Sequence, residues 1–246
     1  MKKCLSLFLM VVMLFSLTAC HTVPDISEDG GTTTASSATT TTTTTQPMVR
    51  ITYSTSENAT LQELQKSCDI LEQRLTAMGM SGYRISITED ETILLEVPRS
   101  YYPGNLNKQA YTWGSQGEFA ICVGDTDDGI VPMPPEDTVL DYRHVESAEA
   151  VMLQSGEYAV TLTFTAEGAD LLADITTELA KTQDYLYFHM DWQFSGTLQV
   201  LQPITDGECV VNGFASWEAA ALFAAQLNAG ILPYNYAADV DFSLVE

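Results

Sequence analysis

Basic residues are scarce in this sequence. Ten Lys and Arg stand against 33 Asp and Glu, which gives a formal net charge of -23 for 246 residues. A nucleic-acid-binding protein needs a positively charged surface that neutralises phosphates, so we expect no nucleic acid among the partners. The same shortage disfavours electrostatic attraction to an anionic bilayer surface. The hydrophobic fraction of 46% is nevertheless large enough for a folded core.

Residues and motifs with specialised chemistry are also few. The three histidines, His21, His144 and His189, have no spacing to one another or to a cysteine that suits a zinc site. The sequence has no Gly-x-Ser-x-Gly nucleophile elbow and no Gly-rich phosphate loop. We therefore expect no catalytic site, no metal and no cofactor, and a function that depends on binding.

Only one long apolar run occurs, from Leu5 to Leu17, and it follows two lysines. It is shorter than the roughly 20 residues of a membrane-spanning helix and is typical of a secretory signal. The run ends in Leu17-Thr18-Ala19-Cys20, which resembles a bacterial lipobox, whose cysteine is lipid-modified and begins the mature chain. We predict a lipoprotein signal peptide at residues 1–19 and lipidation of Cys20, with an ordinary signal peptide as the alternative. The protein would then be extracytoplasmic and anchored by lipid to the cell membrane.

Residues 20–47 differ in composition from the rest of the chain. They include seven consecutive threonines at 39–45 and almost nothing apolar, and such a segment cannot form a packed core. We interpret it as the lipidated cysteine followed by a disordered tether. Fully extended, the part from 27 to 47 would reach roughly 70 Å, which is enough to lift a domain off a membrane surface.

Three cysteines, Cys68, Cys122 and Cys209, fall in the remaining sequence. An odd number does not indicate a disulfide framework, although one bridge and a spare thiol remain an alternative. Each cysteine lies among apolar neighbours, which favours small buried thiols.

The folded domain begins near residue 48 with a β-α-β-β pattern. Alternating β-forming residues at 49–53 predict a strand. Thr60 and Glu63 form a capping box for a helix whose apolar residues recur every three or four positions until Gly79, the predicted C-cap. Two further strands joined by an acidic turn are predicted at 83–88 and 92–97.

Strands and helices then mix without strict alternation. The patterns predict a strand at 118–123, a hairpin of strands at 145–153 and 158–164, a helix at 167–179 capped by Thr165, strands at 185–194, 198–201 and 208–211, and a helix at 217–227 capped by Ser216. This order favours the α+β class over a doubly wound parallel sheet.

Four spaced segments, in the same order, resemble the extracytoplasmic domain of SecD. The first is Thr60–Pro98, a capped helix with an Arg-hydrophobic pair and a Gly, followed by two strands that end in Pro. The others are Gly117–Ile121, the strand-to-helix junction Leu162–Ala169, and Gly213–Ala219 followed by Leu227–Pro233. The last of these is similar to the family's motif Gly-x-Phe-Thr-x-x-Glu-Ala, which precedes a helix ending in Leu-x-Ala-Gly-Ala-Leu-Pro.

The resemblance implies a ferredoxin-like base formed by both ends of the domain, with an inserted α+β head subdomain. We expect the base at 48–112, the head at 113–183, and completion of base and head, including the C-terminal helix, at 184–246. The family's Lys- and Pro-containing hairpin is Met190–Leu198 here and has lost both residues. No second apolar stretch approaches 18 residues. The six membrane-spanning helices that follow this domain in SecD are therefore not expected, and the chain would not be a complete proton-driven SecD motor.

Aromatic residues crowd one predicted strand, at Tyr185, Tyr187, Trp192 and Phe194. Their partial alternation favours a strand that buries one face. The alternative is a polypeptide-binding surface, for which these four residues are our candidates.

Two functional hypotheses follow. The resemblance implies a non-enzymatic accessory of protein export on the outer face of the cytoplasmic membrane. Its partners would be the membrane, through the lipid anchor, and the Sec translocon or secreted polypeptides, which offer backbone hydrogen bonds and apolar side chains. The second hypothesis is a solute-binding or envelope-structural lipoprotein that reuses the fold, because a fold does not fix a function.

Overall fold

The computed structural model describes residues 47–101, 106–124 and 131–245. The predicted signal peptide, Cys20 and nearly all of the predicted tether lie outside the described residues. These features therefore stay predictions.

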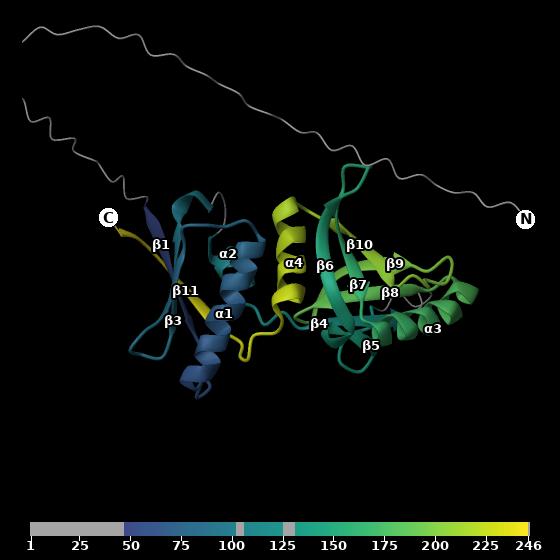
Figure 1. Ribbon diagram of the computed structural model, residues 1–246, viewed down its shortest axis with the longest axis horizontal. Helices are drawn as coiled ribbons and strands as arrows, with labels where there is room; N and C mark the ends of the chain where they lie inside the picture. Colours follow the sequence, from purple (N-terminus) through teal and green to yellow (C-terminus); the bar gives the residue numbers. More distant parts are fainter. Residues whose placement is uncertain (1–46, 102–105, 125–130, 246) are drawn as a thin grey trace, which may run out of the picture. The chain divides into compact units, whose positions relative to one another are not determined.

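One sheet is built from the two ends of the described chain. Its strands are β1 (Met48–Ser54), β2 (Arg84–Ile87), β3 (Ile93–Pro98) and β11 (Ala237–Val245). They are ordered β11-β1-β3-β2, and every neighbouring pair is antiparallel. Helix α1 (Leu61–Ala77) connects β1 to β2 and packs on the sheet (Figure 1). This order is that of a ferredoxin-like domain, as expected for the base.

The sequence of α1 explains both its start and its packing. Thr60 Oγ1 accepts a hydrogen bond from Glu63 N, and the Glu63 carboxylate accepts one from Thr60 N, so the predicted capping box is present. Leu64, Leu71 and Leu75 are at most 1% exposed. Their spacing places them on one face, which packs into the core of the base.

The chain between β3 and β11 forms one further helix of the base and then the head. Helix α2 (Leu106–Trp113) contributes Ala110 and Trp113 to the base core. The head consists of β4 (Phe119–Gly124), β5 (Thr138–Asp141), β6 (Val145–Met152), β7 (Tyr158–Phe164), α3 (Ala166–Thr182), β8 (Tyr185–Met190), β9 (Gln193–Gln199), β10 (Glu208–Phe214) and α4 (Trp217–Ala229). Its strands form two antiparallel sheets, β5-β4-β8-β9 and β10-β7-β6. The predicted α+β class with an inserted head is confirmed.

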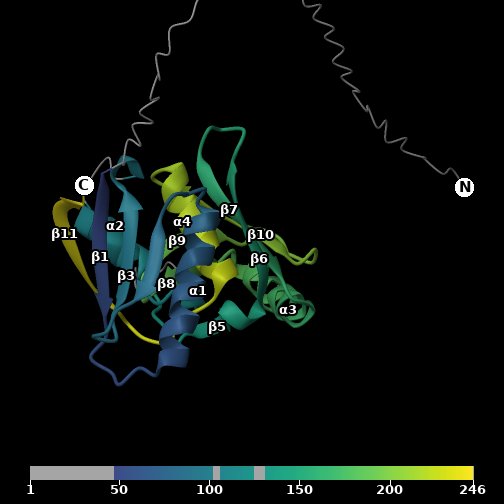
Figure 2. The ribbon, with the colours of Figure 1, turned by 60° about the vertical axis from the view of Figure 1, so that its left-hand side comes forward.

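Helix α4 is shared by the two cores. It is rich in alanine and has apolar residues on most sides, a composition typical of a helix that is covered all round. Ala220, Phe223 and Ala224 belong to the head core, whereas Leu222 and Ala229 pack against the base core. Figure 1 shows α4 between α1 and β6, and in the turned view of Figure 2 α1 passes in front of α4.

Several elements differ from the sequence prediction. The single strand predicted at 185–194 is wrong: it is two strands, β8 and β9, joined by a turn at Asp191 and Trp192. The separate strand predicted at 198–201 is also wrong, because its first two residues are the end of β9. Helix α2 and strands β5 and β11 were not predicted as elements.

Within these described ranges, no helix is both long enough and apolar enough to cross a membrane. Cys68, Cys122 and Cys209 are all buried free thiols, which confirms the interpretation made from their apolar neighbours.

Candidate functional site

A groove of about 730 Å³ separates α2 from β9, β10 and the start of α4. Its larger apolar and aromatic lining residues are Met78, Met80, Tyr101, Tyr111, Trp113, Met190, Phe194, Phe214, Trp217, Leu222 and Phe223. Methionine side chains are flexible and polarisable, so a lining that contains three of them can adapt to apolar groups of different shapes. We refer to this hollow as the groove.

Three aromatic side chains that line the groove are exposed. Tyr111 of α2, Phe194 of β9 and Trp217 of α4 are 57%, 54% and 45% exposed. Exposed apolar groups gathered around a hollow mark an interaction surface. Only Phe194 was among the candidate residues. Sequence patterns gave no signal for Tyr111 and Trp217, because the helices that carry them are far apart along the chain.

The structure brings three of the four candidate residues together. The ring centroids of Tyr185 and Tyr187 are 6.3 Å apart, and those of Tyr187 and Phe194 are 6.5 Å apart. Tyr187 is only 6% exposed, so it supports Phe194 rather than offering a surface of its own. His189 is fully buried beside Phe194, and burial lowers the pKa of its imidazole. Trp192 lies elsewhere, in the turn between β8 and β9.

Arg74 of α1 fixes the place where the chain passes between base and head. It is fully buried, and its guanidinium donates hydrogen bonds to the carbonyl oxygens of Trp113, Ser115, Gln116 and Gly230 at 2.6–3.1 Å. Burial lowers the pKa of Arg74 to about 10. Because this value is still well above 7, the guanidinium stays positively charged at neutral pH. The Arg74 side chain thus holds both segments that connect the base and the head: the one that leaves the base, near Ser115, and the one that returns to it, at Gly230.

Further hydrogen bonds strengthen this junction. Gln226 Nε2 of α4 donates to Ser115 Oγ at 2.7 Å. Leu232 N donates to Gln116 O at 2.9 Å, directly between the two connecting segments. A Cβ at Gly117, whose φ is +83°, would lie 2.5 Å from Nη2 of Arg74, so glycine is required there by both the backbone and the space. The two walls of the groove are therefore joined through this hydrogen-bonded junction.

A second cavity, of about 350 Å³, lies on the head beside the turn between β8 and β9. Trp192 lines it together with Glu118, Pro134, Tyr142 and His144. We refer to it as the head cavity. The sequence indicated Trp192 as a candidate but gave no sign of the other residues. Glu118 directly precedes β4, and Pro134, Tyr142 and His144 flank β5.

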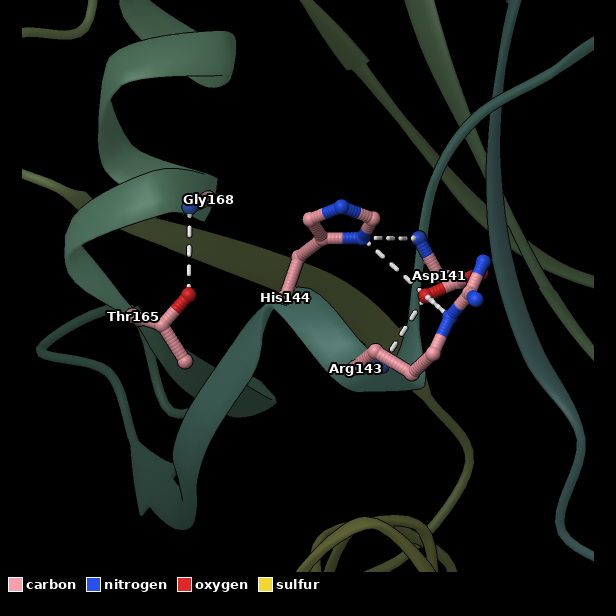
Figure 3. Close-up of polar contacts among 5 residues, drawn as sticks. All are labelled: Asp141, Arg143, His144, Thr165 and Gly168. Carbon is pink, nitrogen blue, oxygen red and sulfur yellow. Dashed lines mark hydrogen bonds and ion pairs between the residues drawn. The ribbon is translucent and has the colours of Figure 1, made fainter.

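Asp141, at the end of β5, organises one wall of the head cavity (Figure 3). Its carboxylate accepts hydrogen bonds from Arg143 N and Nε at 3.0 and 3.1 Å, and Arg143 Nη2 lies 2.6 Å from Oδ2. Burial alone would raise the pKa of Asp141, but the hydrogen bonds and charge of Arg143 outweigh this effect and lower it. His144 Nδ1 accepts a hydrogen bond from Asp141 N at 3.1 Å. Nearby, Thr165 caps α3 as predicted, by accepting a hydrogen bond from Gly168 N (Figure 3).

In the part of the chain that the structure describes, no group of three or more His, Cys, Asp or Glu side chains is arranged to hold a metal ion. The groove is lined mainly by apolar and aromatic side chains, whereas the head cavity combines apolar and aromatic side chains with the polar groups of Glu118, Asp141, Arg143 and His144.

Comparison with known proteins gives a consistent result. Residues 125–234 match the family model of the SecDF P1 head subdomain. The protein translocase subunit SecDF of Thermus thermophilus is 26% identical over 202 residues, which cover 72% of this chain and 27% of the relative. The translocase subunit SecD of Acidaminococcus fermentans is 26% identical over 174 residues, which cover 69% of this chain and 37% of the relative. The match to this chain therefore spans only 27% and 37% of the length of these two relatives.

Solved structures show the same fold. A crystal structure of SecDF in a super-membrane-facing form matches with a TM-score of 0.58 at 24% identity, and the match covers 79% of this chain and 30% of that one. A structure of SecDF, described as a membrane component that enhances protein export, matches with a TM-score of 0.55 at 24% identity, over 77% of this chain and 97% of that one. The described residues thus have the fold of the SecDF P1 domain, residues 125–234 match its head subdomain, and the resemblance to the extracytoplasmic domain of SecD is confirmed.

Proposed function

We propose that this protein is a non-enzymatic accessory of protein export that holds extended segments of emerging polypeptides in the groove. The observation that carries the proposal is the groove itself, with its methionine-rich lining and three exposed aromatic side chains. The match of residues 125–234 to the SecDF P1 head supports the link to export. An unfolded chain offers apolar side chains of many shapes, which suit an adaptable lining.

The proposed location is the outer face of the cytoplasmic membrane. Lipidation of Cys20 would anchor the chain there, since each methylene that enters the bilayer contributes about 0.8 kcal/mol. The Thr-rich segment up to residue 47 would let the folded domain reach a translocon that lies beside the anchor. The Sec translocon and secreted polypeptides are therefore the proposed partners.

The net charge of -23 supports a preference for basic segments. Long-range attraction raises the rate at which a cationic chain meets an anionic protein, and salt screens it. Binding of a polypeptide would therefore weaken as the salt concentration rises.

Photocrosslinking in cells tests the proposal. A photoreactive amino acid replaces Tyr111 or Trp217, which line opposite walls of the groove. The matched controls carry it at Leu201 or Met152, which are 65% and 66% exposed and do not line the groove. We expect the groove positions to crosslink to translocon subunits or to secreted proteins in transit. Crosslinks no stronger than those of the controls would contradict an export role.

The anchor is tested in the same cells. Cell fractionation should find the unchanged protein with the membranes. The Cys20→Ala variant should be found outside them, because alanine has no thiol to carry the lipid. A Cys20→Ala variant that stays fully membrane-bound would contradict the proposed anchor but not the groove.

A further inference from the structure

The turn between β8 and β9 has an unusual composition for its backbone geometry. Its two central residues, Asp191 and Trp192, have φ angles of +50° and +65°. Two-residue hairpin turns with positive φ at both positions favour Asn-Gly or Asp-Gly, because glycine takes this conformation without a steric penalty. A bulky tryptophan with positive φ is an outlier that destabilises the backbone. Such strain is found at functional sites when the surrounding structure holds it in place.

The surroundings hold Trp192 firmly. Asp191 Oδ1 accepts hydrogen bonds from the backbone N–H groups of Gly117 and Glu118 at 2.7 and 2.8 Å. Glu118 Oε2 in turn accepts one from Trp192 Nε1 at 3.2 Å. The indole nevertheless remains 50% exposed, so burial in a core does not account for it. The turn presents a fixed, half-exposed indole to the head cavity.

The charge of the head cavity favours a cation. Asp141 is neutralised by Arg143 through the 2.6 Å ion pair. Among the ion pairs that the described residues form, none involves Glu118, so its negative charge is available beside the indole. A cation near an aromatic face gains cation–π attraction in addition to the charge attraction. Pro134 and Tyr142 supply apolar walls on which the methylene groups of a long side chain can rest.

We propose that the head cavity binds a lysine or arginine side chain of an extended polypeptide, with its charged group beside Glu118 and over the indole of Trp192. The proposal rests on the proposed function, because the basic side chain belongs to the emerging polypeptide that the groove holds. The groove and the head cavity meet at the same turn, because Asp191 and Gln193 line the groove while Trp192 lines the cavity. A peptide held in the groove therefore needs only a few residues to place a basic side chain in the cavity.

Titration with a small probe tests the cavity independently of the groove. The probe is Nα-acetyl-lysine methylamide, and the control is the norleucine analogue, which has the same aliphatic stem without the charge. Trp113, Trp192 and Trp217 each give one indole N–H signal in an NMR spectrum of the full ¹⁵N-labelled chain in detergent. We expect the lysine probe to move the Trp192 signal in a saturable way at concentrations at least tenfold lower than the norleucine probe. An equal response to both probes overturns the proposal.

Two variants separate binding from structure. Trp192→Gly gives the turn its preferred Asp-Gly sequence but removes the indole signal, so binding to this variant is followed by the backbone amide signals of Glu118 and Tyr142, which line the same cavity. We expect it to bind the lysine probe at least tenfold more weakly, while the thermal midpoint stays level or rises by about 2–4 °C. Glu118→Gln keeps the hydrogen-bonding oxygen but removes the charge, so it should weaken lysine binding and leave norleucine binding unchanged. Unchanged lysine binding in either variant overturns the proposal. Loss of crosslinks in the groove with retained lysine binding would instead contradict the proposed function alone.

Discussion

At the scale of single residues, burial decides the chemistry of the three described cysteines. Cys209 is 4% exposed and Cys68 is 7% exposed. Burial raises the pKa of Cys209 to about 12 and that of Cys68 to about 11. Burial also raises the pKa of Cys122. The thiolate is the reactive form of cysteine, so these side chains act as small apolar groups in the cores.

This burial predicts a protected set of thiols. With iodoacetamide at pH 8, we expect Cys68, Cys122 and Cys209 to stay unmodified in the folded protein and to react completely in concentrated urea, as mass spectrometry of peptides would show. The reaction in urea serves as the control for reagent and pH. Rapid modification of any of the three in the folded state would contradict the burial described above.

At the scale of elements, a row of charges crosses the base sheet. Glu96 of β3 lies opposite Arg84 of β2 and Arg50 of β1 in the strand register. Arg84 Nε lies 2.9 Å from one carboxylate oxygen and Arg50 Nε lies 3.2 Å from the other. Opposite charges on facing strand positions stabilise a pair of strands, and here one carboxylate serves two neighbouring strands.

The row predicts a pH-dependent contribution to stability. The hydrogen bond from Arg84 is the main cause that lowers the pKa of Glu96, and partial burial opposes it. A carboxyl whose pKa is lowered in the folded state stabilises the fold above its unfolded pKa of about 4.3, and this stabilisation is lost as the pH falls through the lower folded pKa. We expect Glu96→Gln to lower the free energy of unfolding by about 0.5–1 kcal/mol at pH 7, because Arg50 and Arg84 are partly exposed to solvent.

Urea denaturation between pH 3 and pH 7 measures this effect. The difference between Glu96→Gln and the unchanged protein should shrink as the pH falls below about 4.3. Glu149→Gln, at an exposed strand position, is the control and should have little effect at any pH. A difference that does not change with pH would mean that Glu96 acts through packing and not through its charge.

The starts of helices could be predicted where a capping residue preceded an apolar helical pattern. The capping box of α1, Thr165 before α3 and Ser216 before α4 each mark a helix start that the structure reproduces. The split between β8 and β9 was not predictable, because Trp192 occupies a turn position where glycine would have marked a break. Strand β11 takes its place from pairing with β1 at the other end of the chain, and no local pattern carries that information.

The candidate site was less predictable than the elements that form it. Alternating aromatic residues led to Phe194, because the signal lies within one short segment. Tyr111 and Trp217 face the same groove from α2 and α4, and their proximity is created by the packing of α4 on the base. A binding surface assembled from distant segments leaves no periodic signal in the sequence.

At the scale of the whole molecule, Arg74 carries a large part of the connection between base and head. Its guanidinium satisfies carbonyl groups from both connecting segments. A buried carbonyl that loses its donor destabilises the fold by the cost of its desolvation, and here several would lose it at once. The junction also sets the position of α2 relative to α4, and with it the width of the groove.

Substitutions of Arg74 test this role. Arg74→Met should lower the free energy of unfolding by about 3 kcal/mol or more, because it leaves buried carbonyls without donors. Arg74→Lys should have a smaller effect, since an ammonium group has three donors but lacks the planar fork of a guanidinium. Arg99→Met, at an exposed position, is the matched control and should change the free energy by less than about 0.5 kcal/mol.

Chemical denaturation followed by circular dichroism provides these free energies. The expected order of stability is the unchanged protein and Arg99→Met, then Arg74→Lys, then Arg74→Met. An Arg74→Met variant as stable as the Arg99→Met control would show that the junction holds without the guanidinium.

The hydrogen bond between Leu232 and Gln116 means that the chain leaves the base and returns to it at neighbouring points. A segment inserted between two such points adds little strain to its host, since the ends that it must join are already together, and the entropy of closing a loop grows only slowly with its length. Natural variation can therefore lengthen, reshape or replace the inserted segment while the four-stranded sheet remains intact. For this architecture, new binding specificities can arise by exchange of one module while the base stays unchanged.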